Sequence, residues 1–306
     1  MSNLMIEPAH CEAGKRPSCP AVRAILHPVD RDLGGFSVRR LLPSDRLKSV
    51  GPFVFFDHLG PAQFQPGAGI DVRPHPHIGL ATITYLFAGE ILHRDNLGSI
   101  QAIRPGEINW MTAGRGIAHS ERTPPDLRAA GHTLHALQLW VALPAAQEET
   151  APAFFHYDAS QLPTIDREGA ALRVMIGAAY GVVSPVTTYS PTLYLEARLE
   201  QGATLPLPEG VEEVAVYVVS GMLQTQGTTI PCHCLAAFDP VPGVALTAVE
   251  ASRLVIIGGQ PLGKRIVWWN LVATRSELIE GAKTAWQAGR FAKIPGETEF
   301  IPLPGG

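Results

Sequence analysis

Short apolar runs, separated by glycine and proline, recur along the whole chain. Seven of them are five to nine residues long and rich in leucine, β-branched or aromatic side chains. Runs of this length between turn-forming residues are typical of β-strands. Many short strands with turn signals between them predict an all-β sandwich or barrel. The seven predicted strands are residues 81–87, 107–111, 135–143, 172–177, 193–199, 214–219 and 253–259.

One stretch near the C-terminus has a helical pattern instead. It is "ATRSELIEGAKTAWQAGRF", residues 273–291. Thr274 and Glu277 have the spacing of a capping box, in which each side chain bonds to the backbone N–H of the other residue. Gly289 is placed to end the helix in a left-handed conformation. The sequence therefore predicts one short C-terminal helix added to an all-β fold.

A weak internal repeat relates the two halves of the chain. The segment 84–92, "TYLFAGEIL", matches the segment 216–224, "VYVVSGMLQ", in its apolar pattern. The two segments share a tyrosine at the second position and a glycine at the sixth. Each copy therefore resembles a strand, a glycine turn and a second strand. The repeat predicts two similar β-domains in tandem.

The boundary between these domains is expected in the stretch 143–154, "LPAAQEETAPAF", which is polar and contains prolines. We predict an N-terminal tail over residues 1–20, a first β-domain over 21–145 and a second over 146–306.

Composition narrows the class of protein. The chain has 306 residues, of which 46% are hydrophobic and 17% are charged, and its formal net charge is −4. A nucleic-acid-binding protein would normally be basic, so direct nucleic-acid contact is not expected. The sequence contains no run of eighteen apolar residues and no signal-peptide pattern at its start, so we expect no membrane span. Four cysteines do not make a disulfide framework, and together these features predict a cytoplasmic protein.

Two pairs of polar residues stand next to predicted strands. His75 and His77 are two positions apart, and so are His119 and Glu121. In a strand, such positions point to the same face, roughly 6.6–7 Å apart. Both pairs can therefore converge inside a barrel. Three imidazoles and one carboxylate suit a divalent first-row transition metal, although a single H-x-H is also common by chance and is often structural.

The second half of the chain does not repeat these pairs. At the offset of the internal repeat, His75 corresponds to Leu207 and His77 to Glu209. Only His156 and His233 lie in residues 146–306. We therefore predict a metal site in the first domain and none in the second.

Three segments together resemble the pirin family, a branch of the cupin superfamily. They are "HPHIGLATITYLFAGEILHRDNLG", "IRPGEINWMTAGRGIAHSER" and "GPFVFFDHLGP", and "LVIIGGQPLGKRIVWWNLVATR" resembles the C-terminal half of that family. The resemblance covers nearly the whole chain. It implies a bicupin, with two β-barrels and metal in the N-terminal one alone. The ligands it implies are His75, His77, His119 and Glu121.

The resemblance also implies a function. Iron is the expected metal, and the ligand types also allow Mn, Co, Ni, Cu or Zn. The implied activity is that of a quercetin 2,3-dioxygenase, which opens a flavonol ring with O2 and yields a depside and carbon monoxide, and Glu121 is then the candidate general base. The alternative is a non-catalytic regulator that acts through a protein partner. One departure is Ala81, where many relatives have a glutamate near the metal. The resemblance therefore implies that a polar group is missing from the pocket, which puts the identity of the substrate in doubt.

Other residues have simpler interpretations. "PCHC", with Cys232 and Cys234, lacks the further ligands that a zinc site needs and is interpreted as structural. Trp268 and Trp269 are expected in a core or interdomain contact. His58 is interpreted either as a neighbour of the metal site or as a turn residue. The remaining histidines are expected to be structural or on the surface, and they include His10, His27, His93, His132, His135 and His156.

Overall fold

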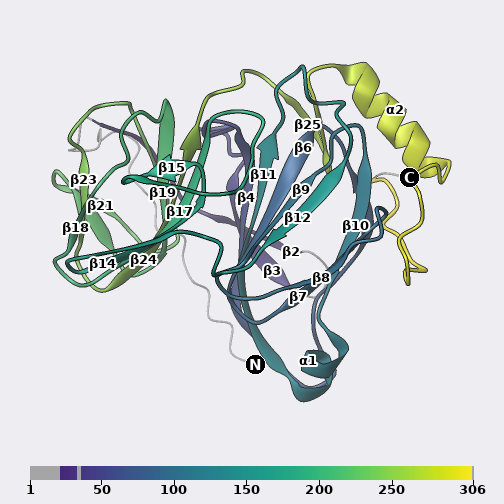
Figure 1. Cartoon of the computed structure of the whole chain (residues 1–306), viewed down its shortest axis with the longest axis horizontal. Coiled ribbons are helices and arrows are strands. Elements are labelled where there is room, and N and C mark those ends of the chain that lie inside the picture. The colour runs from purple at the N-terminus through teal and green to yellow at the C-terminus, as the bar shows by residue number, and fades with distance from the viewer. Residues whose placement is uncertain (1–20, 33–35, 305–306) are drawn as a thin grey trace, which may run out of the picture.

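The computed structural model describes residues 21–32 and 36–304, so the predicted tail, with His10, Cys11 and Cys19, lies outside the described residues. Two β-barrels stand side by side, and one helix, α2 (Ser276–Gln287), lies against the outer end of the first barrel (Figure 1). The predicted all-β class with two tandem barrels and a short C-terminal helix is confirmed.

The first barrel consists of a seven-stranded and a four-stranded sheet. The larger sheet has the order β12 (Ala153–Tyr157), β9 (Ile108–Thr112), β6 (Leu80–Ala88), β11 (His132–Ala142), β4 (Phe53–Phe64), β3 (Ser37–Leu42), β2 (Val29–Asp32). The smaller sheet has the order β5 (Asp71–His77), β10 (Ile117–Arg122), β7 (Ile91–Asp95), β8 (Ile100–Ile103).

The second barrel repeats this arrangement. Its larger sheet has the order β1 (Val22–Leu26), β22 (Leu235–Phe238), β19 (Glu213–Ser220), β24 (Ser252–Gly259), β17 (Thr192–Leu199), β14 (Ala170–Ile176), β13 (Thr164–Arg167). Its smaller sheet has the order β18 (Thr204–Pro206), β23 (Ala245–Ala248), β20 (Leu223–Thr225), β21 (Thr228–Ile230). Two short hairpins complete the strands, β15 (Ala178–Ala179) with β16 (Val182–Val183) and β25 (Ile266–Trp268) with β26 (Leu271–Ala273).

The internal repeat follows this symmetry. Strands β6 and β7 of the first barrel correspond to β19 and β20 of the second. The turn glycine of each copy, Gly89 or Gly221, has a positive φ of 85° or 83°. A side chain is strained in this region of φ, which explains why glycine recurs at both turns.

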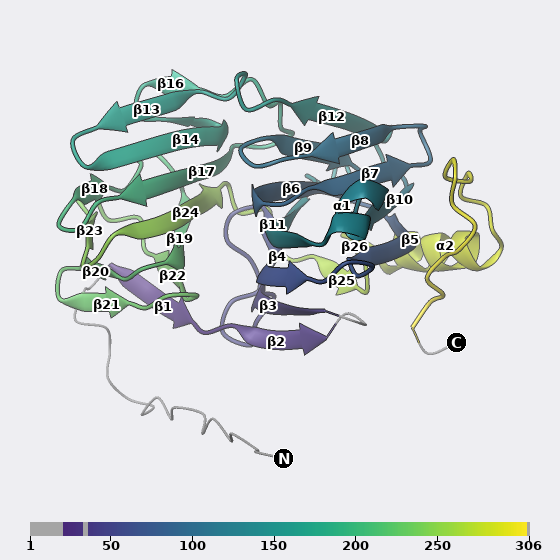
Figure 2. The ribbon, with the colours of Figure 1, turned by 90° about the horizontal axis from the view of Figure 1, so that it is seen from below.

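The two barrels exchange their first edge strands. Strand β1 precedes the first barrel in sequence but pairs with β22 of the second, and β12 follows the first barrel and pairs with its β9 (Figure 2). At its edge, each larger sheet therefore contains a strand from the other side of the predicted division between residues 145 and 146. Each barrel is completed by a strand from the other side of that boundary.

The larger sheets of the two barrels pack on each other through one shared hydrophobic cluster. Two tyrosines that correspond in the repeat reach across it in opposite directions. Tyr85 of the first barrel donates a hydrogen bond to Glu196 of the second, and the hydroxyl of Tyr217 of the second lies 2.6 Å from Nδ1 of His58 of the first. These reciprocal contacts fix the barrels relative to each other, and they place His58 in the interface rather than at a turn.

We predict that Tyr217→Phe lowers the free energy of unfolding by about 1–3 kcal/mol, because it leaves a buried nitrogen of His58 without a partner. Urea unfolding measures this change. Tyr194→Phe is the matched control, since Tyr194 is fully buried nearby and its hydroxyl has no hydrogen-bond partner among the described residues. The control is expected to unfold like the wild type or at slightly higher urea. If both variants lost the same free energy of unfolding, the loss would be due to packing and not to the hydrogen bond.

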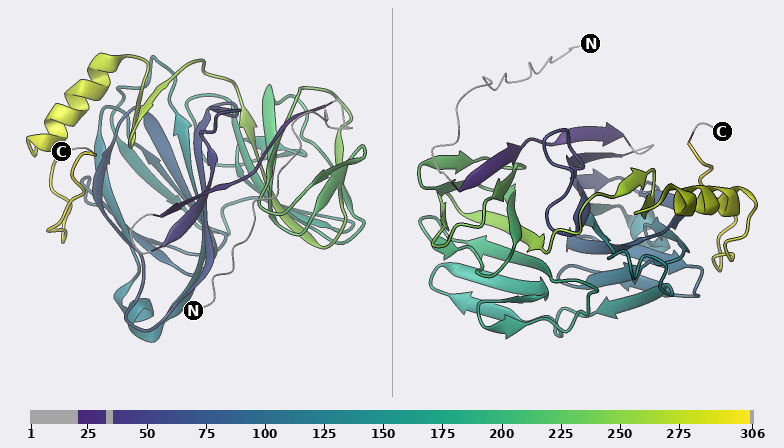
Figure 3. Two further views of the ribbon diagram at one scale, coloured as in Figure 1. Left: turned by 180° about the vertical axis from the view of Figure 1, so that it is seen from behind. Right: turned by 90° about the horizontal axis from the view of Figure 1, so that it is seen from above.

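The C-terminal segment returns to the first barrel. Leu271 of β26 bridges Ile78, and the backbone N–H of Ile301 donates to the carbonyl of Pro74 at 2.8 Å. Helix α2 follows β26 and contacts it at the outer end of the first barrel (Figure 3). The predicted stop at Gly289 is confirmed by its φ of 65°. The predicted capping box is wrong, because Thr274 Oγ1 donates to Glu148 at 2.6 Å and α2 begins after Arg275 without a side-chain cap.

A second helix was not expected from the sequence. It is α1 (Pro125–Ala130), which begins directly after Pro124 and has Pro125 as its first residue. Within the described residues, neither helix combines the length and the apolar character that crossing a membrane requires.

Candidate metal centre

Three histidines converge in the first barrel. Strands β5 and β10 are antiparallel, and His119 stands directly opposite His75. The candidate ligand atoms of His75, His77 and His119 all lie within 4.8 Å of one another, and Nε2 of His77 is 3.1 Å from Nε2 of His119. All three side chains are buried. Because side chains alternate along a strand, the three histidines of the two predicted pairs point to one place in the barrel.

The opposite ring nitrogens of two of these histidines are held by carbonyl groups. Nδ1 of His75 donates to the carbonyl of Arg73 at 2.9 Å, and Nδ1 of His77 donates to the carbonyl of Asn270 at 2.9 Å. A carbonyl only accepts, so each Nδ1 carries the proton of the neutral ring. Each Nε2 is left with its lone pair, which points into the group.

The third histidine is oriented by a chain of side chains. Nδ1 of His119 lies 3.4 Å from Nδ1 of His93, and Nε2 of His93 lies 3.1 Å from a carboxylate oxygen of Asp95. The carboxylate accepts from Nε2 of His93, so Nδ1 of His93 is free to accept from His119. The lone pair of His119 is then on Nε2. Asp95 is held in turn by the backbone N–H groups of Leu97 and Ser99.

The electrostatics favour neutral imidazoles at this point. Burial lowers the pKa of His75 to about 4, and burial together with neighbouring histidines lowers the pKa values of His77 and His119 well below the ordinary value. Three lone pairs directed at one another repel, and a cation between them relieves this repulsion. The residues present therefore fit a transition metal ion, which prefers neutral imidazole ligands.

Glu121 lies beside the three histidines but outside their close group. Its side chain is largely buried, and its Oε1 accepts a hydrogen bond from Thr84 at 3.1 Å. Burial raises the pKa of the Glu121 carboxyl, while His93 and the hydrogen bond from Thr84 oppose this rise. Its role as a fourth ligand stays a prediction.

The four predicted site residues line one cavity of about 450 Å³. Its wall includes the stacked rings of Phe55 and Trp140, whose centroids are 3.9 Å apart. The C-terminal segment closes it with Trp269, Asn270 and Ile301. The cavity thus combines a cluster of metal-ligating groups with aromatic side chains in its wall.

Comparisons with known proteins identify the family. The model of the pirin domain matches residues 35–141, and the model of the pirin C-terminal cupin domain matches residues 194–292. A pirin-like protein of Caulobacter vibrioides is 46% identical over 279 residues, which cover 90% of this chain and 96% of that protein. The chain belongs to the pirin family. Human pirin is 32% identical over 243 residues, which cover 76% of this chain and 80% of that protein.

A solved structure agrees with this assignment. The pirin-family chain described here matches the crystal structure of quercetin 2,3-dioxygenase from Acinetobacter baumannii with a TM-score of 0.85. The two are 31% identical, and the match covers 92% of this chain and 94% of that chain. The predicted family is therefore confirmed.

Sequence reasoning missed several contributors to this pirin-family site. His93 is among the histidines that the sequence predicts to be structural or on the surface, but it is buried and orients His119. The signal was present, because His93 and Asp95 form a third pair at i, i+2, on a strand beside His119. Trp269 is expected from the sequence in a core or interdomain contact, yet it lines the cavity. No sequence pattern points to the carbonyl of Asn270.

The expectation for Ala81 is corrected. This residue is fully buried and belongs to the hydrophobic cluster between the barrels, together with Ile83 and Tyr85. Side chains alternate along β6, so Thr84 faces the cavity and Ala81 faces the other way. The absence of a glutamate at this position therefore removes no polar group from the cavity.

The other chemistry-bearing residues lie elsewhere. His58 contacts Tyr217 and His135 between the barrels, so it is not part of the metal centre. Within the described residues, Cys232 and Cys234 form no disulfide, and Sγ of Cys234 lies 3.4 Å from Nδ1 of His27. A second group that could hold a metal ion, Glu107, His156 and Asp158, lies partly exposed at the outer edge of the larger sheet.

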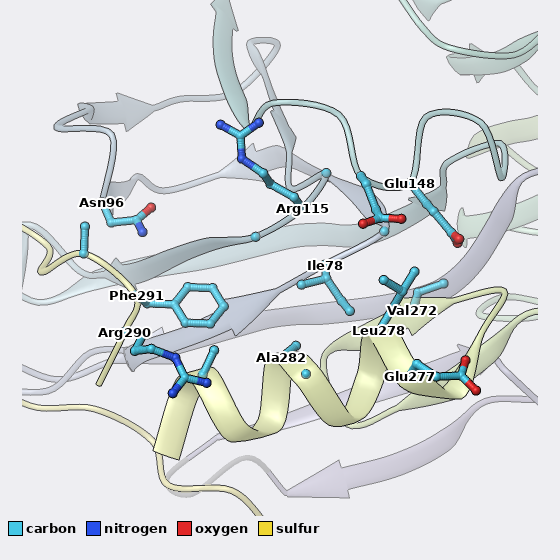
Figure 4. Close-up of a pocket in the computed structure, with 17 residues that line it drawn as sticks. Ile78, Asn96, Arg115, Glu148, Val272, Glu277, Leu278, Ala282, Arg290 and Phe291 are labelled. Atoms are coloured by element: carbon cyan, nitrogen blue, oxygen red, sulfur yellow. The ribbon is translucent and has the colours of Figure 1, made fainter. Parts of the chain in front are cut away.

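A second hollow of about 430 Å³ lies between α2 and the loop at residues 113–116. Its floor includes Ile78, Val272 and Ala282, and Arg115 and Arg290 lie on its two sides (Figure 4). No histidine is among the residues that line it. The cavity with the three histidines is therefore the candidate active site.

We predict that His93→Leu weakens metal binding by roughly 10–100-fold, because loss of the partner on Nδ1 frees the ring of His119 to rotate. Competition with a fluorescent chelator measures the affinity. His132→Leu is the control, since His132 is a buried histidine that contacts Thr123 and stacks on Phe64, away from the site. Unchanged affinity in His93→Leu would show that His119 needs no such support.

Proposed function

We propose that this pirin-family protein is a metal-dependent dioxygenase of the quercetin 2,3-dioxygenase type, which opens a flavonol ring with O2. The observation that carries the proposal is the group of three buried, neutral histidines whose Nε2 lone pairs face a cavity with an aromatic wall. The similarity to a solved quercetin 2,3-dioxygenase supports it. The cytoplasmic location expected from the sequence stays a prediction.

His75, His77 and His119 would hold the metal, with Glu121 as the proposed fourth ligand. Iron is the first candidate, and Mn, Co, Ni, Cu and Zn also suit these ligand types. When bound, the ion supplies a Lewis acid that lowers the pKa of a coordinated hydroxyl group. The overall reaction consumes one flavonol and one O2 and releases one depside and one carbon monoxide, so no other reductant is needed.

The protein itself binds, orients and shields the substrate. Phe55 and Trp140 line the cavity and offer apolar contact area for an aromatic substrate. Trp269 and Ile301 reduce the access of water. Glu121 is buried at the cavity wall, where its carboxylate can accept the proton of the substrate hydroxyl.

The experiment is turnover of quercetin under air, followed by loss of flavonol absorbance and release of carbon monoxide. Activity is expected to disappear on chelation and to return with one added metal. Zn²⁺-loaded protein tests whether turnover requires a metal that can change its oxidation state, since Zn²⁺ cannot. If no candidate metal gives turnover, the proposal is wrong, and the alternative, a regulator that acts through a protein partner, takes its place.

A further inference from the structure

A row of polar residues crosses the larger sheet of the first barrel. The strand registers place six residues directly opposite one another on β3, β4, β11, β6, β9 and β12. In this order they are Arg40, Asp57, Gln138, Thr84, Asn109 and His156, and we call them the polar row. Directly opposed residues of neighbouring strands share a face of the sheet.

The second barrel has no such row. The same registers on β14, β17, β24, β19, β22 and β1 place apolar residues at every corresponding position. They are Val174, Leu195, Ile256, Val216, Ala236 and Ile25. Polar groups inside a barrel cost free energy unless they are bonded, so a barrel needs no polar row to fold. The polar row therefore has a role that is specific to the first barrel.

Most members of the row are satisfied by one another. Arg40 makes two hydrogen bonds to the carboxylate of Asp57, at 2.8 and 2.7 Å. Nδ1 of His156 lies 2.7 Å from Oδ1 of Asn109. Thr84 lies between Glu121 and Gln138. Its hydroxyl oxygen is 3.1 Å from Oε1 of the Glu121 carboxylate and 3.0 Å from the amide oxygen of Gln138.

Two of these residues still offer groups to the cavity. Gln138 uses only its amide oxygen, so within the described residues the two N–H donors of its Nε2 have no partner. Asp57 uses one lone pair on each oxygen for Arg40 and has others left. Both side chains line the cavity of the three histidines. A hydrogen-bond donor and an acceptor thus stand next to each other on adjacent strands.

We infer that Gln138 and Asp57 form a recognition pair for two neighbouring oxygen atoms of the substrate, such as vicinal hydroxyl groups. One hydroxyl donates to Asp57, and the adjacent oxygen accepts from Nε2 of Gln138. The inference rests on the proposed function and adds the polar end of the substrate to it. The reacting end of the substrate would lie at the histidines. Phe55 borders the polar end of the substrate, and the Arg40 guanidinium lies over the Phe55 ring, 4.5 Å from its centroid.

The test compares two ligands that differ at one position. Quercetin has two neighbouring hydroxyls on its pendant ring, and its analogue has one hydroxyl there. Binding is measured by tryptophan fluorescence without O2, on metal-free and on Zn²⁺-loaded protein. The wild type is expected to bind the diol roughly tenfold more tightly in both forms, since a net hydrogen bond is worth about that factor. Gln138→Leu, which imitates the second barrel, is expected to remove the preference while keeping affinity for the single hydroxyl.

Gln63→Leu is the matched control. Gln63 lies on β4 and its amide oxygen accepts from Thr133 at 2.6 Å, as Gln138 accepts from Thr84, but it does not line the cavity. This control is expected to keep the full preference. The metal content of each variant must equal that of the wild type. A further variant, Asp57→Asn, keeps the shape of the side chain and is expected to reduce the preference as well.

The outcomes separate this inference from the proposed function. Absence of turnover with a preserved preference for the diol would reject the dioxygenase and keep the recognition pair. Equal affinity of the wild type for both ligands would overturn the pair, and so would a preference that survives in Gln138→Leu. If Gln138→Leu bound neither flavonol, Gln138 would have a structural role instead.

Discussion

His75→Ala and His119→Ala are each expected to reduce metal affinity by at least about 100-fold while leaving the fold largely intact. Loss of a supporting residue already costs about 10–100-fold, and a lost ligand costs more. The fold should survive because these imidazoles face a cavity and belong to no hydrophobic cluster. Elemental analysis of dialysed protein gives the metal content, and circular dichroism with urea unfolding reports the fold.

His156→Ala is the control for this prediction. His156 belongs to the partly exposed group with Glu107 and Asp158, and its loss should leave the metal content unchanged. The second barrel should not compensate, because Leu207 and Glu209 stand at the positions that correspond to His75 and His77. A full equivalent of metal in either cavity variant would reject the proposed ligands.

The strands and the three converging histidines could be predicted because both depend on local periodicity. Apolar runs between glycines specify strands, and the i, i+2 spacing fixes which face a side chain takes. The exchange of β1 and β12 could not be predicted in this way. Strand β1 pairs with residues more than 200 positions away, and periodicity carries no information about such a partner.

The errors at the site and at α2 have the same physical origin. Thr274 has the local spacing of a cap, but Glu148, which is distant in the sequence, accepts its hydroxyl instead. His77 is oriented by the backbone of Asn270, and a carbonyl group is present at every residue of any sequence. Ala81 was placed near the metal by resemblance, although its position in the alternation of β6 directs it to the core between the barrels. Tertiary contacts decided each of these cases.

Glu121→Gln is expected to lower quercetin turnover by roughly 10²–10⁴-fold at equal metal content, if Glu121 is the general base. Glutamine has nearly the same size and can still ligate through its carbonyl oxygen, but it cannot accept a proton as a carboxylate does. Thr84 can still donate its hydrogen bond to that oxygen, so the side chain should keep its position. The variant must be reloaded to the metal content of the wild type before turnover is measured.

The pattern of losses distinguishes the roles of this residue. A base gives a large loss of turnover and a small loss of metal, whereas a residue that only ligates gives the reverse. Glu107→Gln is the control, because Glu107 is a partly buried glutamate of the same barrel that does not line the cavity. It is expected to retain wild-type turnover. Near-wild-type turnover of Glu121→Gln at equal occupancy would reject the base, and the proton would then have to leave the substrate hydroxyl by another route.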